Sequence, residues 1–307
     1  MSCTVDLVEA EVYNAYASRD FNTAIKGLDY LVSVQPGDPR WREFRGAVLI
    51  DAKRFTEGLA DYNAALELVR DLAGPAQAQA DATGKVNGRD APAELVREKF
   101  GSTEARLLSG RALAYEGLGE WKAALDDYNA ALEVAGRAGL RPDPFVVNSR
   151  GNVNASLERW QDARDDYLAS ARGFQMAKGF RSPTGSTTQR LDGAIFASSN
   201  AALMLAQLGD EAGATKEMER IARRAPGSSD MKIALSALYW SQGREQEAED
   251  LWRFACEEIV VGCEQYRDKR WLREVRRWPP RMVERMSDFL SIRGPKPGSG
   301  AASGAGA

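Results

Sequence analysis

One segment recurs along this chain, and its recurrence constrains the fold more than any other feature. In its three most similar copies the segment carries an aromatic residue, a small residue, a second aromatic residue and a second small residue, in that order. Equivalent small residues lie 34 positions apart, as Ala24 and Gly58 do, and again Ala214 and Ala248. A fixed period of this length predicts stacked helical hairpins, in which small residues let helices approach and aromatic residues fill the gaps. The three most similar copies are residues 54–66, 120–132 and 159–171.

This pattern resembles the tetratricopeptide repeat (TPR) family, in which each repeat is a helix A followed by a helix B. The segment upstream of each copy carries a small residue at the expected helix-A position, except that Val12 replaces it in the first repeat. The resemblance covers roughly residues 5–262. It implies an all-α fold: a TPR solenoid, a right-handed superhelix of about six helical hairpins, with C-terminal capping helices. The small helix-A residues are Gly46, Ala112, Gly151, Ala202 and Ser236.

The spacing of the copies predicts the domain organisation. A solenoid over residues 1–262 is interrupted by insertions at about 73–103, 137–145 and 173–190. We expect the first insertion to be a flexible loop followed by a helix starting near Ala93, and leave the third open between a functional loop and disorder. Residues 263–293 form a helical cap. The Gly-, Pro- and Ala-rich tail, 294–307, is expected to be disordered.

The composition excludes several classes of function. The chain has no histidine and three cysteines, so histidine-based catalysis, a Cys₄ site and a resident metal are not expected. A net charge of −3 argues against nucleic acid as a ligand. No phosphate-binding glycine motif is present, and no apolar stretch is long enough to span a membrane. We therefore predict a chain that is not an enzyme, binds no cofactor and binds protein partners.

The TPR resemblance implies that helices A line a concave groove that binds peptides. Helix-A positions expected to face a ligand carry aromatic or polar residues, and asparagine amides can grip a peptide backbone through a donor and an acceptor. Hydrogen bonding between neighbouring helices is an equally good interpretation of these asparagines. The predicted groove residues are Phe145, Asn148, Asn152, Phe196, Ser199 and Asn200.

The family's clamp for acidic C-terminal peptides needs lysine and asparagine at fixed helix-A positions in three repeats. This chain carries other residue types there, so a cytosolic heat-shock cochaperone role is not expected. The residues present are Glu9, Tyr13, Glu43, Ala47, Ser109 and Leu113.

Charged residues also recur at equivalent positions of the central repeats. Arginine recurs in helix A and aspartate in helix B, which predicts an ion pair within each repeat. Such a pair contributes little to stability if it is exposed. The pairs are Arg45 with Asp61, Arg111 with Asp127, and Arg150 with Asp166.

Cys256 and Cys263 form a possible disulfide. In a continuous helix, seven residues separate Cα atoms by about 10 Å, whereas a disulfide needs about 4.4–6.8 Å. Bridging therefore requires the helix to end near Gly262. We favour two free thiols over a bridge, and a bridge would indicate an oxidising compartment.

The C-terminal segment is strongly basic, with seven basic and two acidic residues within 267–281. A Trp-Pro-Pro sequence, 278–280, should separate a capping helix from a final helix over about 281–292. Packing on the last repeat is the favoured role, and contact with anionic lipid or an acidic protein is the alternative. The predicted basic cap surface is Arg270, Arg273, Arg276 and Arg277.

The run from Cys263 to Leu290 (Cys-x-x-Tyr-x-Asp, then Trp, Arg-Arg-Trp-Pro-Pro and Phe-Leu) resembles the C-terminus of chloroplast TPR proteins of plants and algae. The resemblance implies a thylakoid-associated factor, on the stromal or the lumenal side, that assists assembly, repair or stability of a photosynthetic complex. Photosystem subunits or other assembly factors would be its partners, with peripheral membrane contact. The alternative is an adaptor or regulatory subunit of a soluble complex, binding through its convex face or basic cap. The N-terminus has no transit-peptide character, so a processed form is one expectation.

Overall fold

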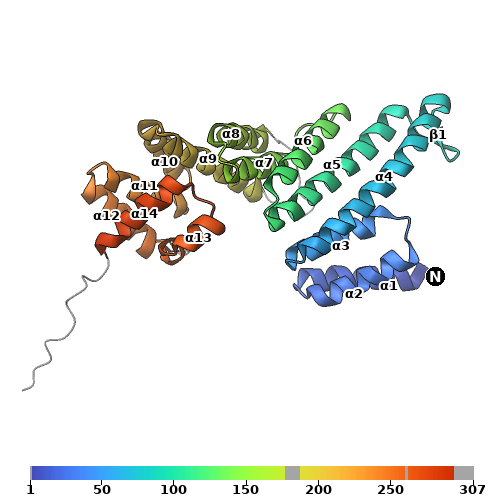
Figure 1. Cartoon of the computed structure of the whole chain (residues 1–307), viewed down its shortest axis with the longest axis horizontal. Coiled ribbons are helices and arrows are strands. Elements are labelled where there is room, and N and C mark those ends of the chain that lie inside the picture. Colours follow the sequence, from blue (N-terminus) through green and yellow to red (C-terminus); the bar gives the residue numbers. More distant parts are fainter. Residues whose placement is uncertain (1, 177–186, 260–261, 294–307) are drawn as a thin grey trace, which may run out of the picture. The chain divides into compact units, whose positions relative to one another are not determined.

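The computed structural model describes residues 2–176, 187–259 and 262–293 of the 307-residue chain. Most of the third predicted insertion and the whole predicted disordered tail lie outside these residues. The chain divides into two compact units, Met1–Arg159 (unit 1) and Trp160–Ala307 (unit 2), and each is described by itself. The described residues are almost entirely helical, which confirms the predicted all-α fold (Figure 1).

Unit 1 consists of antiparallel helices that pack against their neighbours in chain order, with one short strand pair at a turn. The A helices are α1, α3, α5 and α7, and the B helices in this unit are α2, α4 and α6. The elements are α1 (Ser2–Ala17), α2 (Phe21–Val34), α3 (Pro39–Asp51), α4 (Phe55–Thr83), β1 (Lys85–Val86), β2 (Arg89–Asp90), α5 (Ala93–Leu118), α6 (Trp121–Arg137) and α7 (Pro144–Ser156).

Unit 2 continues the alternation, with α9 and α11 as A helices and α8, α10 and α12 as B helices. A 3-10 turn and two further helices follow the last hairpin and form the cap. The elements are α8 (Trp160–Met176), α9 (Thr187–Leu208), α10 (Glu211–Arg224), α11 (Asp230–Ser241), α12 (Glu245–Glu257), η1 (Glu264–Arg267), α13 (Lys269–Glu274) and α14 (Pro280–Arg293).

The turn between helix A and helix B has one backbone signature in every repeat. One residue of each turn adopts the left-handed conformation, which terminates helix A and reverses the chain. Glycine adopts this conformation without strain, whereas for another residue type the conformation costs about 1 kcal/mol or more of conformational free energy. The repeat therefore appears in the conformation of the turns as well as in the packing of the helices. These residues are Arg19, Lys53, Gly119, Glu158, Gly209 and Gly243.

Small residues create the space that the aromatic residues fill, as the repeat pattern predicts. The ring of Tyr62 on α4 packs against both Gly46 on α3 and Gly110 on α5. A Cβ atom at Gly110 would lie only 2.3 Å from that ring. One buried tyrosine of a B helix thus joins the A helices of two successive repeats.

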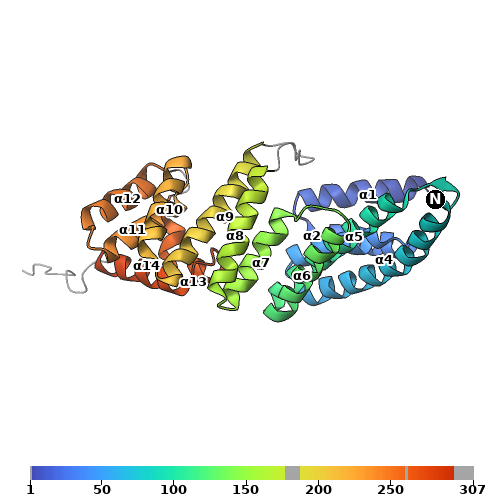
Figure 2. The ribbon, with the colours of Figure 1, turned by 90° about the horizontal axis from the view of Figure 1, so that it is seen from above.

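The first insertion is ordered, so the prediction of a flexible loop there is wrong. Figures 1 and 2 show α4 and α5 running side by side to the β1–β2 hairpin, in which Lys85 pairs with Asp90. The alanines that follow Leu72 are strong helix formers, and Ala80 and Val96 are buried in this part of the unit. Packing of the two helices therefore outweighs the cost of Pro75 inside α4. The predicted helix start near Ala93 is confirmed.

The cap follows its predicted pattern. The last helix begins at Pro280, close to the predicted start, and four of its apolar residues are fully buried while Leu290 is half-buried. Helix α14 packs against α11 and α9, which are A helices (Figure 1). The four buried residues are Met282, Val283, Met286 and Phe289.

Candidate functional site

The A helices of unit 1 share a surface that is held together by aromatic and charged side chains. Tyr13 and Tyr16 on α1 contact the ring of Phe44 on α3, with ring centroids 5.1 and 5.6 Å apart. The Tyr16 hydroxyl donates a 2.7 Å hydrogen bond to Asp51, and this bond raises the pKa of Tyr16 to about 12. These contacts fix α1 against α3.

A charged pair then links α3 to α5 on this surface. Arg106 donates two hydrogen bonds to Glu43, at 2.7 and 2.8 Å, and these bonds raise the pKa of the Arg106 guanidinium. Both oxygens of Glu43 are used, so this carboxylate is not available as an isolated acceptor. The pair presents a fixed, mixed-charge element between two A helices.

Several large apolar side chains of the unit 1 A helices are exposed, among them Tyr13, Leu113 and Phe145. Tyr13 is 52%, Leu113 is 44% and Phe145 is 52% exposed. Tyr13 and Leu113 each follow the small or β-branched core residue of helix A, so they occupy the same position in different repeats. Exposed large apolar side chains are typical of protein-binding surfaces. We call Tyr13, Phe44, Leu113 and Phe145, with the Glu43–Arg106 pair, the unit 1 A face.

The predicted groove residues divide between the two units. Phe145 belongs to the unit 1 A face, and Asn148 and Asn152 lie half-buried on the same helix, α7. The Oδ1 atom of Asn148 is buried and accepts no hydrogen bond from the described part of the chain. Its role in peptide binding stays a prediction.

In unit 2 the other predicted groove residues are mostly buried. Ser199 and Asn200 are buried on α9, and only Phe196 is exposed. The Asn200 side chain accepts a 2.8 Å hydrogen bond from Arg276 of the cap. In this structure Ser199 and Asn200 are therefore enclosed within unit 2 instead of facing an open groove.

Arg276 is the centre of a buried latch, so its prediction as part of a basic surface is wrong. It donates two hydrogen bonds to Asp230 at the start of α11, at 2.8 and 2.5 Å, and its guanidinium lies 4.8 Å from the Phe196 ring. Burial alone would lower the pKa of Arg276, but the adjacent Asp230 charge outweighs it and the pKa is raised. Sequence could not reveal this role, because neighbouring arginines in one segment differ only in their tertiary partners.

The latch includes two aromatic residues of the cap. The hydroxyl of Tyr266 donates a 3.2 Å hydrogen bond to Asp230, and the indole of Trp278 donates a 3.4 Å bond to the same carboxylate. Burial and the Asp230 charge raise the pKa of Tyr266. We call Asp230, Tyr266, Arg276 and Trp278 the cap latch.

The remaining predicted basic residues form a weaker surface than their number suggests. Arg270 is exposed, but it pairs with Glu274 of the same short helix at 2.8 Å. Arg277 is half-buried and adopts a positive φ of 57°. Arg273 is exposed.

Cys256 and Cys263 are bridged, with Cα atoms 4.8 Å apart, so the favoured expectation of free thiols is wrong. Helix α12 ends at Glu257, and Gly262 adopts a left-handed conformation that helps to return the chain. The helix therefore ends even before the predicted glycine. The bridge ties the first residue of the cap to the last repeat.

Two of the predicted arginine–aspartate pairs are confirmed within unit 1. Arg45 binds Asp61 at 2.7 and 2.6 Å, and Arg111 binds Asp127 at 2.7 Å through two nitrogens. Both pairs are largely buried, unlike the exposed pair considered above. Arg150 and Asp166 belong to different units, so that pair stays a prediction. These pairs build the scaffold.

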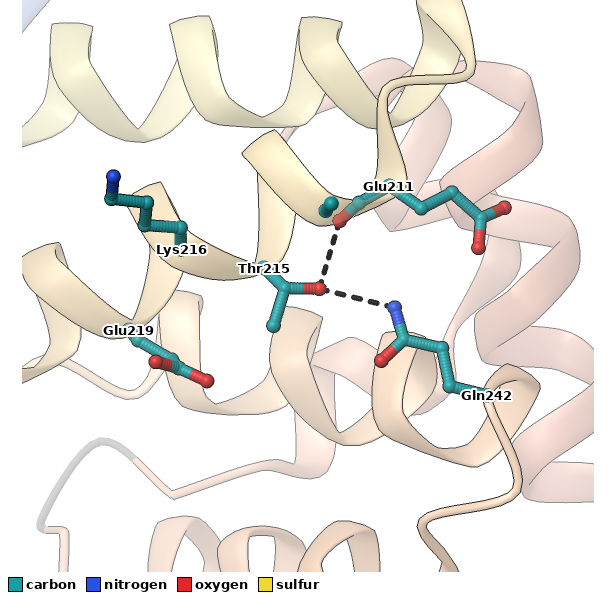
Figure 3. Close-up of a pocket in the computed structure, with 6 residues that line it drawn as sticks. Glu211, Thr215, Lys216, Glu219 and Gln242 are labelled. Carbon is teal, nitrogen blue, oxygen red and sulfur yellow. Dashed lines mark hydrogen bonds between the residues drawn. The ribbon is translucent and has the colours of Figure 1, made fainter.

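Surface hollows in the described part of unit 2 show no convergent chemistry. Figure 3 shows one of them, where Thr215 donates a hydrogen bond to the Glu211 carbonyl and accepts one from Gln242. Within residues 2–176, 187–259 and 262–293 there is no cluster of histidine, cysteine or acidic residues that could hold a metal. In the same residues no helix is both long and apolar enough to cross a bilayer.

Comparison with solved structures finds similar folds among TPR proteins. A tetratricopeptide repeat protein from Parabacteroides merdae matches over 95% of this chain and 94% of its own, with a TM-score of 0.56 and 14% identity. The apo form of RapI matches over 94% and 97%, with a TM-score of 0.60 and 12% identity. BtubC from P. vanneervenii matches over 98% of both chains, with a TM-score of 0.50 and 18% identity.

Identities this low establish the fold alone. The chain thus has a TPR-like all-α repeat fold, which supports its interpretation as a TPR protein. No protein-family model and no curated protein matches the sequence.

Proposed function

We propose that this chain is a non-catalytic scaffold that binds a protein partner on the unit 1 A face. The single observation that carries the proposal is the set of exposed apolar side chains Tyr13, Leu113 and Phe145. Burying them removes apolar area from water, which favours association by about 25 cal/mol per Å². The TPR-like fold supports a protein partner as the ligand.

The residues of this face favour a partner segment that carries both apolar and polar side chains. Apolar side chains of the partner would pack on Tyr13, Phe44 and Leu113, while the Glu43–Arg106 pair offers fixed polar groups that orient them. Aromatic and arginine residues are the types that carry most binding energy at protein interfaces.

The finer part of the proposal concerns the cellular compartment and the protein complex that the chain assists. We propose a chloroplast, thylakoid-associated factor that assists a photosynthetic complex, supported by the resemblance of the run from Cys263 to Leu290. Several residues of that run form the disulfide and the cap latch, as Cys263, Tyr266 and Arg276 do. The run therefore supports a shared cap and does not by itself identify the client.

The test is quantitative affinity capture from thylakoid extracts with a triple variant, Tyr13→Ala, Leu113→Ala and Phe145→Ala. At about 1 kcal/mol for each side chain, the variant should retain roughly a hundredfold less client. The matched control truncates three exposed apolar residues of B helices: Tyr30→Ala, Leu72→Ala and Phe254→Ala.

Equal retention by the two triple variants would refute binding on the unit 1 A face. Loss of client only in an Arg273→Glu, Lys269→Glu variant would instead support the adaptor alternative, in which the cap binds. Photosystem subunits among the lost proteins would support the chloroplast proposal, and an unrelated soluble complex would refute it.

A further inference from the structure

The A helices of unit 2 are covered by the chain's own last helix. Helix α14 packs against α11 and also contacts α9, and Figure 1 shows it beside α11. The N-terminal part of α14 lies at the end of α9, where the backbone N–H of Arg281 donates a 3.0 Å hydrogen bond to Gln207. A second residue, Arg285, pairs with Glu211 at the start of α10.

Residues at one repeat position differ in burial between the two units. Tyr13 and Leu113 of unit 1 directly follow the core residue of helix A and are 52% and 44% exposed. The residues at that position in unit 2 are Leu203 and Ala237, which are 1% and 0% exposed. In the other two A helices of unit 1 this position is half-buried, as Ala47 and Asn152, so full burial at this position is found in unit 2.

The contacts of α14 resemble those of a bound helical ligand. Phe289 lies between the rings of Trp240 on α11 and Trp252 on α12, at centroid distances of 5.7 and 5.6 Å. Met282 and Met286, two turns and one turn before Phe289, are fully buried on the same face. Methionine side chains adapt to irregular surfaces and are common where helices bind in grooves.

The contacts that hold the rest of the cap do not depend on α14. The cap latch and the Cys256–Cys263 bridge both hold residues that precede Pro279. Two prolines, Pro279 and Pro280, separate these anchors from the buried side chains of α14. Release would therefore be confined to α14, from Pro280 to Arg293.

We propose that the face of α9 and α11 is a helix-binding groove that α14 fills in cis. From a partner protein it takes an amphipathic helix with large apolar anchors at positions i, i+4 and i+7, as in Met282, Met286 and Phe289. The partner helix displaces α14 and pairs a basic residue with Glu211. This inference stands apart from the proposed function, because it concerns a different surface.

The test uses a labelled synthetic peptide of residues 279–293 added to the full chain. In a Phe289→Ala chain the internal helix is weakened, so the open fraction rises and the peptide should bind at least tenfold more tightly than to the wild type. The matched control is Asp288→Ala, which changes an exposed neighbour on α14. A peptide carrying Met286→Ser and Phe289→Ser should bind neither chain.

Equal affinity of the peptide for wild type, Phe289→Ala and Asp288→Ala overturns the proposal, and so does equal binding of the serine peptide. If the wild-type chain forms a dimer and excess peptide dissociates it, the groove is occupied by a second copy of this chain. That result would overturn the proposal of a partner protein's helix.

Hydrogen exchange of the wild-type chain gives a readout that does not depend on the folding of a variant. The amides of α14 should exchange at least tenfold faster than those of α11. Equal exchange in the two helices would show that α14 is an inseparable part of the core, which overturns displacement. Client loss in the Tyr13, Leu113 and Phe145 variant tests only the unit 1 A face, so the two proposals can fail separately.

Discussion

Removal of the Arg111 guanidinium should destabilise unit 1 strongly, because it leaves a buried carboxylate without its cation. Asp127 is only 6% exposed, and Arg111 donates two hydrogen bonds to it and a third, of 2.8 Å, to Asn63 of the preceding repeat. These hydrogen bonds to Asp127 raise the pKa of Arg111, which stays charged. Removing one partner of a buried pair costs about 3–5 kcal/mol. We therefore expect Arg111→Leu to lower the free energy of unfolding by about 3 kcal/mol.

The assay is urea unfolding of the full chain followed by helical circular dichroism. With a slope of about 2 kcal/mol per M, a loss of about 3 kcal/mol lowers the midpoint of the unit 1 transition by about 1.5 M. The double variant Arg111→Leu, Asp127→Leu removes the unpaired charge as well, so it should recover most of that loss.

The control is Arg137→Leu, since Arg137 and Glu133 form an exposed pair 3.9 Å apart. That change should alter stability by less than about 0.5 kcal/mol. An Arg111→Leu variant as stable as this control, or a double variant no more stable than the single one, would refute the reasoning.

Three further predictions concern other parts of the fold. Replacing Cys256 and Cys263 with serine reopens an eight-residue loop and should lower the stability of unit 2 by about 2 kcal/mol in oxidised samples, measured with and without dithiothreitol. Gly110→Ala forces a Cβ atom against Tyr62 and should destabilise unit 1 by about 1–3 kcal/mol in urea, despite better helix propensity. The pKa of Tyr16 in the folded chain, about 12, lies above that of an unfolded tyrosine, so the stabilisation from its hydrogen bond should be lost as pH rises from about 10 through 12. An absorbance titration should show one phenol with this raised pKa in the wild type and none in Tyr16→Phe.

The sequence predicted those features that depend on local periodicity. The 34-residue spacing from Ala24 to Gly58 gave the paired helices, because small and aromatic residues must recur wherever successive hairpins pack alike. The same logic correctly paired Arg45 with Asp61. It failed over the first part of the 73–103 insertion, where turn-forming residues hid the continuation of α4 to Thr83, which packs against α5.

The candidate sites depend much more on contacts between distant residues. Arg273 and Arg276 are indistinguishable in a basic run, yet one is exposed and the other binds Asp230 in the interior. Asn200 is of a residue type that often binds ligands, but its side chain accepts a hydrogen bond from Arg276, 76 residues away.

The sequence by itself therefore determined the helices, their pairing and the cap, because each follows from a pattern within one or two repeats. Tertiary structure alone decided which A-helix surfaces are open. Leu113 in unit 1 is 44% exposed, whereas Leu203, at the equivalent repeat position in unit 2, is 1% exposed. Burial is a property of the assembled chain, so a repeat position that looks the same in every copy can be a binding surface in one unit and a core residue in the other.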